Sequence, residues 1–176
     1  MKNLISIFLL LLSFALSVSA QTNEARKLDE FGLIQCGEFM ARMDGIRTEA
    51  ENSPDSNIYV VYYGRRFNRI SLWNKKTRRH DRIRLEYPHR EDGLNWAKSI
   101  PFYLTSGFIY KTRALPKDKI VLVNGGFREN IGVEVWLVPE DAEPPEPNSE
   151  IDEKIIKFRS DKPLKTPNFT TCYSGY

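Results

Sequence analysis

The sequence predicts an α+β protein, and three observations support this class. Residues 58–63 (IYVVYY) form a short, β-branched and aromatic run, as expected of a central strand buried on both faces. Residues 37–52 have the three- and four-residue apolar spacing of an amphipathic helix, carried by Phe39, Met40, Met43 and Ile46. Within residues 65–90, apolar and polar side chains alternate on either side of a polar turn at 74–77, which predicts a hairpin.

Residues 1–20 have the features of a secretory signal peptide. Lys2 gives a positive start, residues 4–16 are mostly apolar, and residues 18–20 (VSA) offer the small side chains that signal peptidase recognises. A retained membrane helix needs about 20 apolar residues, and this stretch is shorter. We therefore expect an exported protein, periplasmic or secreted, that is cleaved after Ala20 and has no stable membrane span after cleavage.

The rest of the 176-residue chain has the length of one domain with a tail. We expect an α+β domain at 21–139 with a basic insertion at 65–90, followed by an acidic, Pro-rich linker and C-terminal tail at 140–176. Prolines at 144, 145 and 147 favour an extended linker. Beyond it, the apolar residues Ile155, Ile156 and Phe158 are expected to dock a last short strand.

Three further segments complete the expected secondary structure. A first strand is predicted in residues 27–35, and a second helix in residues 92–105 that Pro101 should kink or delay. Two closing strands are predicted at 119–123 and 132–138. Between them, the paired glycines of residues 124–126 indicate a tight reversal or a close approach of backbone.

Charge is distributed in two opposite blocks. Residues 65–90 hold ten Arg and Lys against two acidic residues, and residues 140–153 hold seven acidic residues and no basic one. The two blocks can pair with each other across the fold, or be solvated, which would leave little field for a ligand. The other interpretation is that the basic block binds an anionic partner.

The two cysteines, Cys36 and Cys172, are expected to form a disulfide in an oxidising compartment. This bond would tie the tail to the domain. The chain has no CxxC motif and only two histidines, so we predict no metal site and no cofactor.

The predicted order strand, helix, strand, helix, strand, strand is similar to the OmpA-like domain of bacterial envelope proteins. Four runs carry the resemblance: 97–104 (AKSIPFYL), 115–120 (LPKDKI), 126–129 (GFRE) and 133–135 (VEV). It covers about 31–139 and implies a mixed β-sheet with two helices packed on one face, to which this chain adds the basic hairpin. Residues 28–32 (LDEFG) also resemble the opening of a group of uncharacterised exported bacterial proteins.

The resemblance does not extend to the family's ligand site. OmpA-like domains grip the diaminopimelate stem of peptidoglycan with an Asp just after the second strand and an Arg just before the second helix. The first position falls in the region of Arg65 and Arg66, and the second falls on Trp96. This reversal of charge should abolish that mode of binding.

The candidate binding residues are therefore those of the hairpin itself. They are basic residues interleaved with aromatic ones, and the predicted site consists of Arg65, Arg66, Arg69, Lys75, Lys76, Arg78, Arg79, Arg82, Arg84 and Trp73, with Phe67 and Tyr87 nearby. Arginine grips phosphate or carboxylate with paired hydrogen bonds, and aromatic faces offer stacking surface. A cell-wall polymer, a lipopolysaccharide phosphate or extracellular nucleic acid would fit this chemistry, although export argues against nucleic acid.

Two other functions are compatible with the residues. The hairpin or the tail can contact another envelope protein, which would make the chain a scaffold. A hydrolase is the less favoured alternative, using His80 and His89 with the carboxylates Asp81, Glu86, Glu91 and Asp92. Since no Gly-x-Ser-x-Gly elbow, HExxH helix or phosphate loop occurs, we assign no catalytic residue and expect a protein that is not an enzyme.

Overall fold

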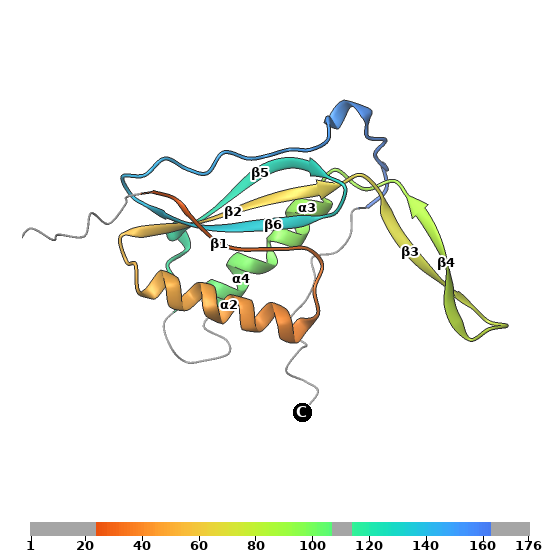
Figure 1. The fold of residues 1–176 in the computed structure, drawn as a ribbon, viewed down its shortest axis with the longest axis horizontal. Coiled ribbons are helices and arrows are strands. Elements are labelled where there is room, and N and C mark those ends of the chain that lie inside the picture. The colour runs from red at the N-terminus through yellow and green to blue at the C-terminus, as the bar shows by residue number, and fades with distance from the viewer. Residues whose placement is uncertain (1–23, 107–113, 163–176) are drawn as a thin grey trace, which may run out of the picture.

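The computed structural model describes residues 24–106 and 114–162 (Figure 1). The expected signal peptide with its cleavage position, and Cys172 of the expected disulfide, lie outside these residues. The helices are α2 (Cys36–Glu51), α3 (Asp92–Ala97) and α4 (Ser99–Ser106), with single 3-10 turns η1 (Lys117–Lys119) and η2 (Glu153–Ile155). The strands are β1 (Arg26–Phe31), β2 (Ser56–Arg65), β3 (Asn68–Asn74), β4 (Arg79–Glu86), β5 (Ile120–Arg128) and β6 (Gly132–Pro139).

Four of the strands form one mixed sheet in the order β1-β6-β2-β5. β6 runs antiparallel to both of its neighbours, whereas β2 and β5 are parallel. The predicted α+β class is confirmed, as is the central position of residues 58–63, which lie in β2 between β6 and β5. Ile58, Val60 and Val61 in this strand are at most 1% exposed, which explains why the run is nearly all apolar.

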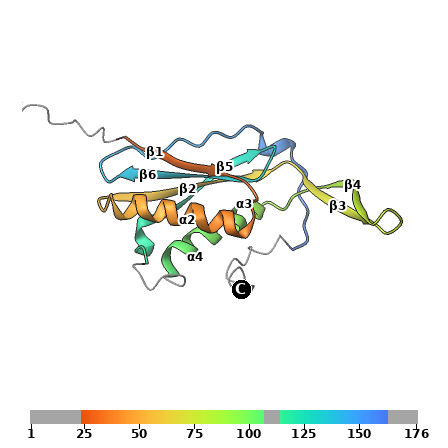
Figure 2. The same ribbon diagram turned by 60° about the horizontal axis from the view of Figure 1, so that its bottom comes forward.

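The main core lies between one face of this sheet and the helices, which both views place on the same side (Figures 1 and 2). Phe39 and Met43 of α2 and Leu104 of α4 are fully buried there against Val60 and Val135 of the sheet. Each such side chain contributes about 1.5 to 3 kcal/mol by leaving water. The apolar spacing that predicts α2 is therefore the face that this helix turns to the sheet.

The second predicted helix is two helices with a break at Lys98. Proline has no N–H, so Pro101 cannot donate a hydrogen bond to the carbonyl of Ala97, four residues earlier. The break falls directly after that residue, where α3 ends. The expected effect of Pro101 is thus confirmed, as a separation of two short helices.

The predicted reversal at residues 124–126 is wrong, because β5 continues through the glycines and the chain reverses at 129–131. Tyr62 pairs with Asn124 and Gly64 with Phe127, so β5 holds one extra residue at a β-bulge. Gly126 accommodates it with a φ of +85°. The alternative interpretation, a close backbone approach, is correct for Gly125, where a Cβ would come within 2.4 Å of the Tyr63 ring.

The segment after β6 is not a free linker, because it packs along the sheet face opposite the helices (Figure 1). The backbone N–H of Asn148 donates to the Tyr63 hydroxyl over 3.3 Å. Ile151 forms an isolated antiparallel bridge with Phe127, and Ile156 and Phe158 pack against the same ring. Docking of Ile156 and Phe158 agrees with the sequence prediction, but residues 155–158 form no strand, because they end and follow the 3-10 turn η2, and Ile155 is 64% exposed.

Among the described helices, none is both long enough and apolar enough to cross a lipid bilayer.

Candidate binding site

The predicted basic hairpin is present as β3 and β4, which form a two-stranded sheet of their own and project away from the domain (Figures 1 and 2). The register changes near its end, since Leu72 pairs with Arg82 but Trp73 pairs with His80. In the connecting loop, the side chain of Asn74 accepts a hydrogen bond from the Lys76 backbone over 3.0 Å. This side chain shapes the loop that displays the basic residues.

The end of the hairpin gathers exposed cations around an aromatic pair. We call this set the tip; it consists of Trp73, Lys75, Lys76, Arg78, Arg79 and His80. All six side chains are exposed, and no described acidic side chain forms an ion pair with any of the four cations. Trp73, which is 53% exposed, packs against the His80 ring with 5.1 Å between centroids. The tip therefore offers concentrated positive charge beside an open aromatic surface.

Other predicted basic residues already have partners at the opposite end of the hairpin. Arg84 forms an ion pair with Glu86. Arg66 lies 3.2 Å from the carboxylate of Glu129, and its guanidinium stacks over Phe67 at 5.3 Å from the ring centroid. These contacts occupy the charges of Arg66 and Arg84, which distinguishes the two residues from the cations of the tip.

Arg65 differs from the other arginines because its side chain is partly buried at the end of β2. Burial lowers the pKa of Arg65, and the nearby charge of Asp92 opposes this effect. Its buried Nε atom has no hydrogen-bond partner in the structure. For Arg69 and Arg82, only the backbones are described, and they pair with Leu85 and Leu72.

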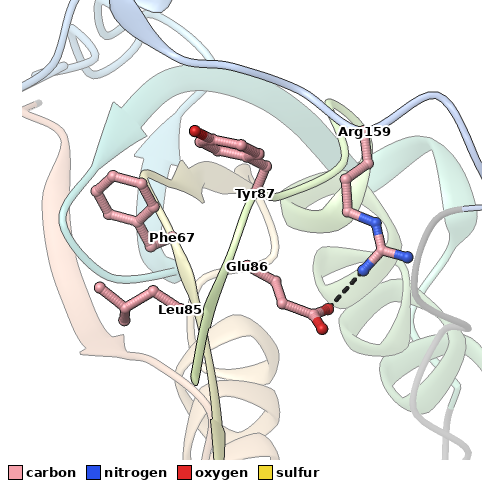
Figure 3. Close-up of a pocket in the computed structure, with 5 residues that line it drawn as sticks. All are labelled: Phe67, Leu85, Glu86, Tyr87 and Arg159. Carbon is pink, nitrogen blue, oxygen red and sulfur yellow. Dashed lines mark hydrogen bonds and ion pairs between the residues drawn. The ribbon is translucent and has the colours of Figure 1, made fainter. Parts of the chain in front are cut away.

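A groove of about 440 Å³ lies at the base of the hairpin (Figure 3). We call it the basal groove; it is lined by Phe67, Leu85, Glu86, Tyr87 and Arg159. The rings of Phe67 and Tyr87 lie 6.2 Å apart. Arg159 comes from the tail and lies 2.6 Å from the carboxylate of Glu86. Sequence reasoning identified the two aromatic residues but missed Arg159, because no local pattern connects the tail to the hairpin.

The ion pairs described for the acidic block lie away from the tip. Its Glu140 pairs with Lys119 at 2.8 Å, and its Glu150 lies 3.7 Å from Arg128. Glu153 reaches the basic segment, but at Arg90, which follows the hairpin. The described pair that joins the two blocks, Glu153 with Arg90, thus lies at the base of the hairpin and not at the tip.

The histidines of the hydrolase interpretation do not converge. His80 lies at the tip, whereas His89 is buried beyond the other end of β4, with its Nε2 3.4 Å from Asp161. His80 is the second residue of β4 and His89 lies three residues beyond its end, so the strand from His80 to Glu86 alone separates them by about 20 Å. Within residues 24–106 and 114–162, no three His, Cys, Asp or Glu side chains are grouped so that they could hold a metal ion.

One buried ionic cluster lies outside the hairpin, on the sheet face covered by the tail. Glu134 is 6% exposed and accepts hydrogen bonds from Arg128 at 2.8 Å and from Tyr63 and Trp136 at 3.2 Å each. Burial raises the pKa of Glu134, but the hydrogen bonds from Arg128 and Trp136 outweigh it and bring this pKa below its ordinary value. Because these partners are themselves held in the fold, we assign the cluster to stability.

The fold and the hairpin together define an α+β protein that displays a cationic, aromatic tip. Comparison with known protein families, with curated proteins and with solved structures finds no match to this chain.

Proposed function

We propose that this protein is an exported, non-catalytic binding module of the cell envelope or cell wall, and that its hairpin tip contacts an anionic polymer. The single observation that carries this proposal is the set of four exposed cations that no described acidic side chain pairs with, next to Trp73 and His80. Arginine forms paired hydrogen bonds with phosphate or carboxylate groups, and lysine adds point charges. The aromatic pair offers stacking surface to the same ligand.

We further propose that the domain is OmpA-like. Without the hairpin, the described elements follow the order strand, helix, strand, helix pair, strand, strand, and the helices share one face of a mixed sheet. The hairpin is inserted directly after β2, next to the position at which the family carries its ligand-binding Asp. The proposal therefore includes replacement of the family's peptidoglycan site by the tip.

The envelope location rests on the signal sequence of residues 1–20. Export would also permit the disulfide between Cys36 and Cys172. Cys36 is the first residue of α2, so this bond would attach the end of the tail to the helical layer of the domain.

Cosedimentation with purified cell-wall polymer tests the proposal. The tip variant replaces Lys75, Lys76, Arg78 and Arg79 with Ala. A control variant removes the same charge from exposed lysines elsewhere, by replacing Lys98, Lys117, Lys154 and Lys162 with Ala. We expect the wild type and the control to be retained at low salt and released at about 0.5 M salt, and the tip variant not to be retained. Failure of the wild type to bind at any salt, or equal retention of the tip variant, would contradict the proposal.

A further inference from the structure

One face of the hairpin is apolar and open to solvent. In the register of β3 and β4, Trp73 is opposite His80 and Ser71 is opposite Ile83. Residues two apart in a strand share a face, so Trp73, Ile83 and Leu85 lie on the same side. They are 53%, 69% and 58% exposed. We call these three side chains the apolar face.

Tyr87 continues this surface toward the domain. It follows β4 by one residue, is 44% exposed and lines the basal groove together with Leu85 (Figure 3). An aromatic residue therefore stands at each end of the hairpin, with two aliphatic side chains between them. Arg69 and Ser71 pair with Leu85 and Ile83 across the hairpin, so polar positions border this row. A row of large exposed apolar side chains rimmed by polar residues is typical of an interaction site.

The tail contacts the hairpin at its base, where Arg159 pairs with Glu86. Among the described strands, β3 and β4 pair only with each other. An isolated two-stranded hairpin is marginally stable in water, and exposed Ile and Leu side chains add a cost of hydration. A partner that buries the apolar face would offset both costs.

The arrangement of charge and apolar surface decides which partner fits. A hydrated soluble polymer can pair with the tip cations, but it gives Ile83 and Leu85 no apolar surroundings. An anionic lipid surface satisfies both groups, because lipid phosphates attract Lys and Arg while the acyl boundary receives aliphatic side chains. Trp and Tyr, as at positions 73 and 87, are the side chains that favour the level of the lipid headgroups.

We infer that the hairpin docks on an anionic lipid surface, with the apolar face entering the headgroup region and the tip cations contacting lipid phosphates. The inference rests on the proposed function, since the same tip supplies the charge. It deepens that function by placing the anionic groups on a lipid. A soluble glycan or a protein partner would be the outcome of the test if the lipid surface fails.

The test uses the full mature chain and vesicles of phosphatidylcholine with or without phosphatidylglycerol. Ile83→Thr with Leu85→Thr removes the two aliphatic side chains of the apolar face and places at both positions a β-branched residue that favours a strand. Leu33→Thr is the matched control, since Leu33 is 57% exposed and lies outside the hairpin. The Trp fluorescence emission spectrum is recorded with and without vesicles. Comparison with Trp73→Phe separates the signal of Trp73 from the signals of Trp96 and Trp136.

We expect the wild type and Leu33→Thr to bind the phosphatidylglycerol vesicles, with a blue shift that Trp73→Phe removes. The double variant should bind these vesicles at least about tenfold more weakly, while its retention on cell-wall polymer stays at the wild-type level. Equal vesicle binding by the double variant, or no spectral shift of Trp73, would overturn the inference.

A wild type that binds cell-wall polymer but no vesicles would overturn the lipid inference alone and leave the proposed function standing. A wild type that binds neither would count against both. If the hairpin instead pairs with a second copy of the chain, sedimentation velocity without lipid would show a larger sedimentation coefficient. That result would also contradict the lipid assignment.

Discussion

Arg159 of the tail pairs with Glu86 at the end of β4, with 2.6 Å between Nη1 of the guanidinium and Oε2 of the carboxylate. The Arg159 backbone also donates to the carbonyl of Pro88 over 3.0 Å. Two residues later, Asp161 lies 3.4 Å from Nε2 of His89. The base of the hairpin is thus held by a segment more than seventy positions away in the sequence.

Arg159→Ala should loosen the hairpin without unfolding the domain. The pair is partly exposed, so its loss should lower the free energy of unfolding by no more than about 1 kcal/mol. Backbone amides of β3 and β4 should nevertheless exchange faster with solvent, as hydrogen-exchange mass spectrometry would show. Arg26→Ala is the control, because it breaks the Arg26–Glu49 pair far from the hairpin. It should leave the exchange of the β3 and β4 amides unchanged. Unaltered exchange in Arg159→Ala would argue against this tether.

Ile151→Ala should destabilise the whole domain if the tail is part of the fold. Ile151 is 8% exposed and packs against Phe127, so the substitution removes buried methyl groups and should cost about 2 to 3 kcal/mol. Ile155→Ala is the control, because Ile155 is 64% exposed and should change stability by less than about 0.5 kcal/mol. Denaturant unfolding measures both values. Similar small losses in the two variants would mean that the tail is only a linker.

Gly126→Ala and Gly45→Ala should change stability in opposite directions. Gly126 has a φ of +85°, and a Cβ there would come within 2.6 Å of the Ser149 hydroxyl, so alanine should cost about 1 to 3 kcal/mol. Gly45 lies inside α2 with nothing within 4 Å of an added Cβ. Alanine there should add about 0.5 to 1 kcal/mol. Thermal unfolding of both variants is the measurement, and a neutral Gly126→Ala would contradict the bulge.

Glu134 should contribute stability that disappears in acid. Its pKa is lower in the folded protein than in the unfolded chain, so the contribution is complete above the unfolded pKa and is lost as pH falls through the folded one. Glu134→Gln should lower the free energy of unfolding by about 2 kcal/mol at neutral pH. In this variant the free energy of unfolding should also fall less steeply as the pH drops below about 5. Exposed Glu129→Gln should have little effect at neutral pH. If the variant loses stability in acid as steeply as the wild type does, Glu134 is not the cause of that loss.

Local periodicity was sufficient to predict much of the fold. The apolar run of β2, the helical spacing of α2 and the alternation of the hairpin each depend on residues close together in sequence. The paired glycines were ambiguous, because a reversal and a β-bulge both need a residue that tolerates positive φ. Docking of the tail was harder to predict, since an acidic, Pro-rich segment has the composition of a linker and its partner, Phe127, is remote in sequence.

The candidate site was predicted only in part for a similar reason. The density of Arg and Lys in residues 65–90 indicates a basic surface, but it cannot divide paired from unpaired cations. That division depends on tertiary contacts, such as the ion pair of Arg66 with Glu129. The apolar face was visible in the sequence only as the alternation of a strand, because its exposure depends on how the hairpin projects.

The most direct test of the central claim is the salt dependence of binding to a soluble polyphosphate. If the tip is the anion site, the affinity of the wild type should fall steeply as salt rises, whereas the tip variant should bind weakly with a much flatter dependence. The Lys98, Lys117, Lys154 and Lys162 control should retain the wild-type dependence. Equal losses in the tip variant and this control would show that net charge governs binding and would contradict a site at the tip.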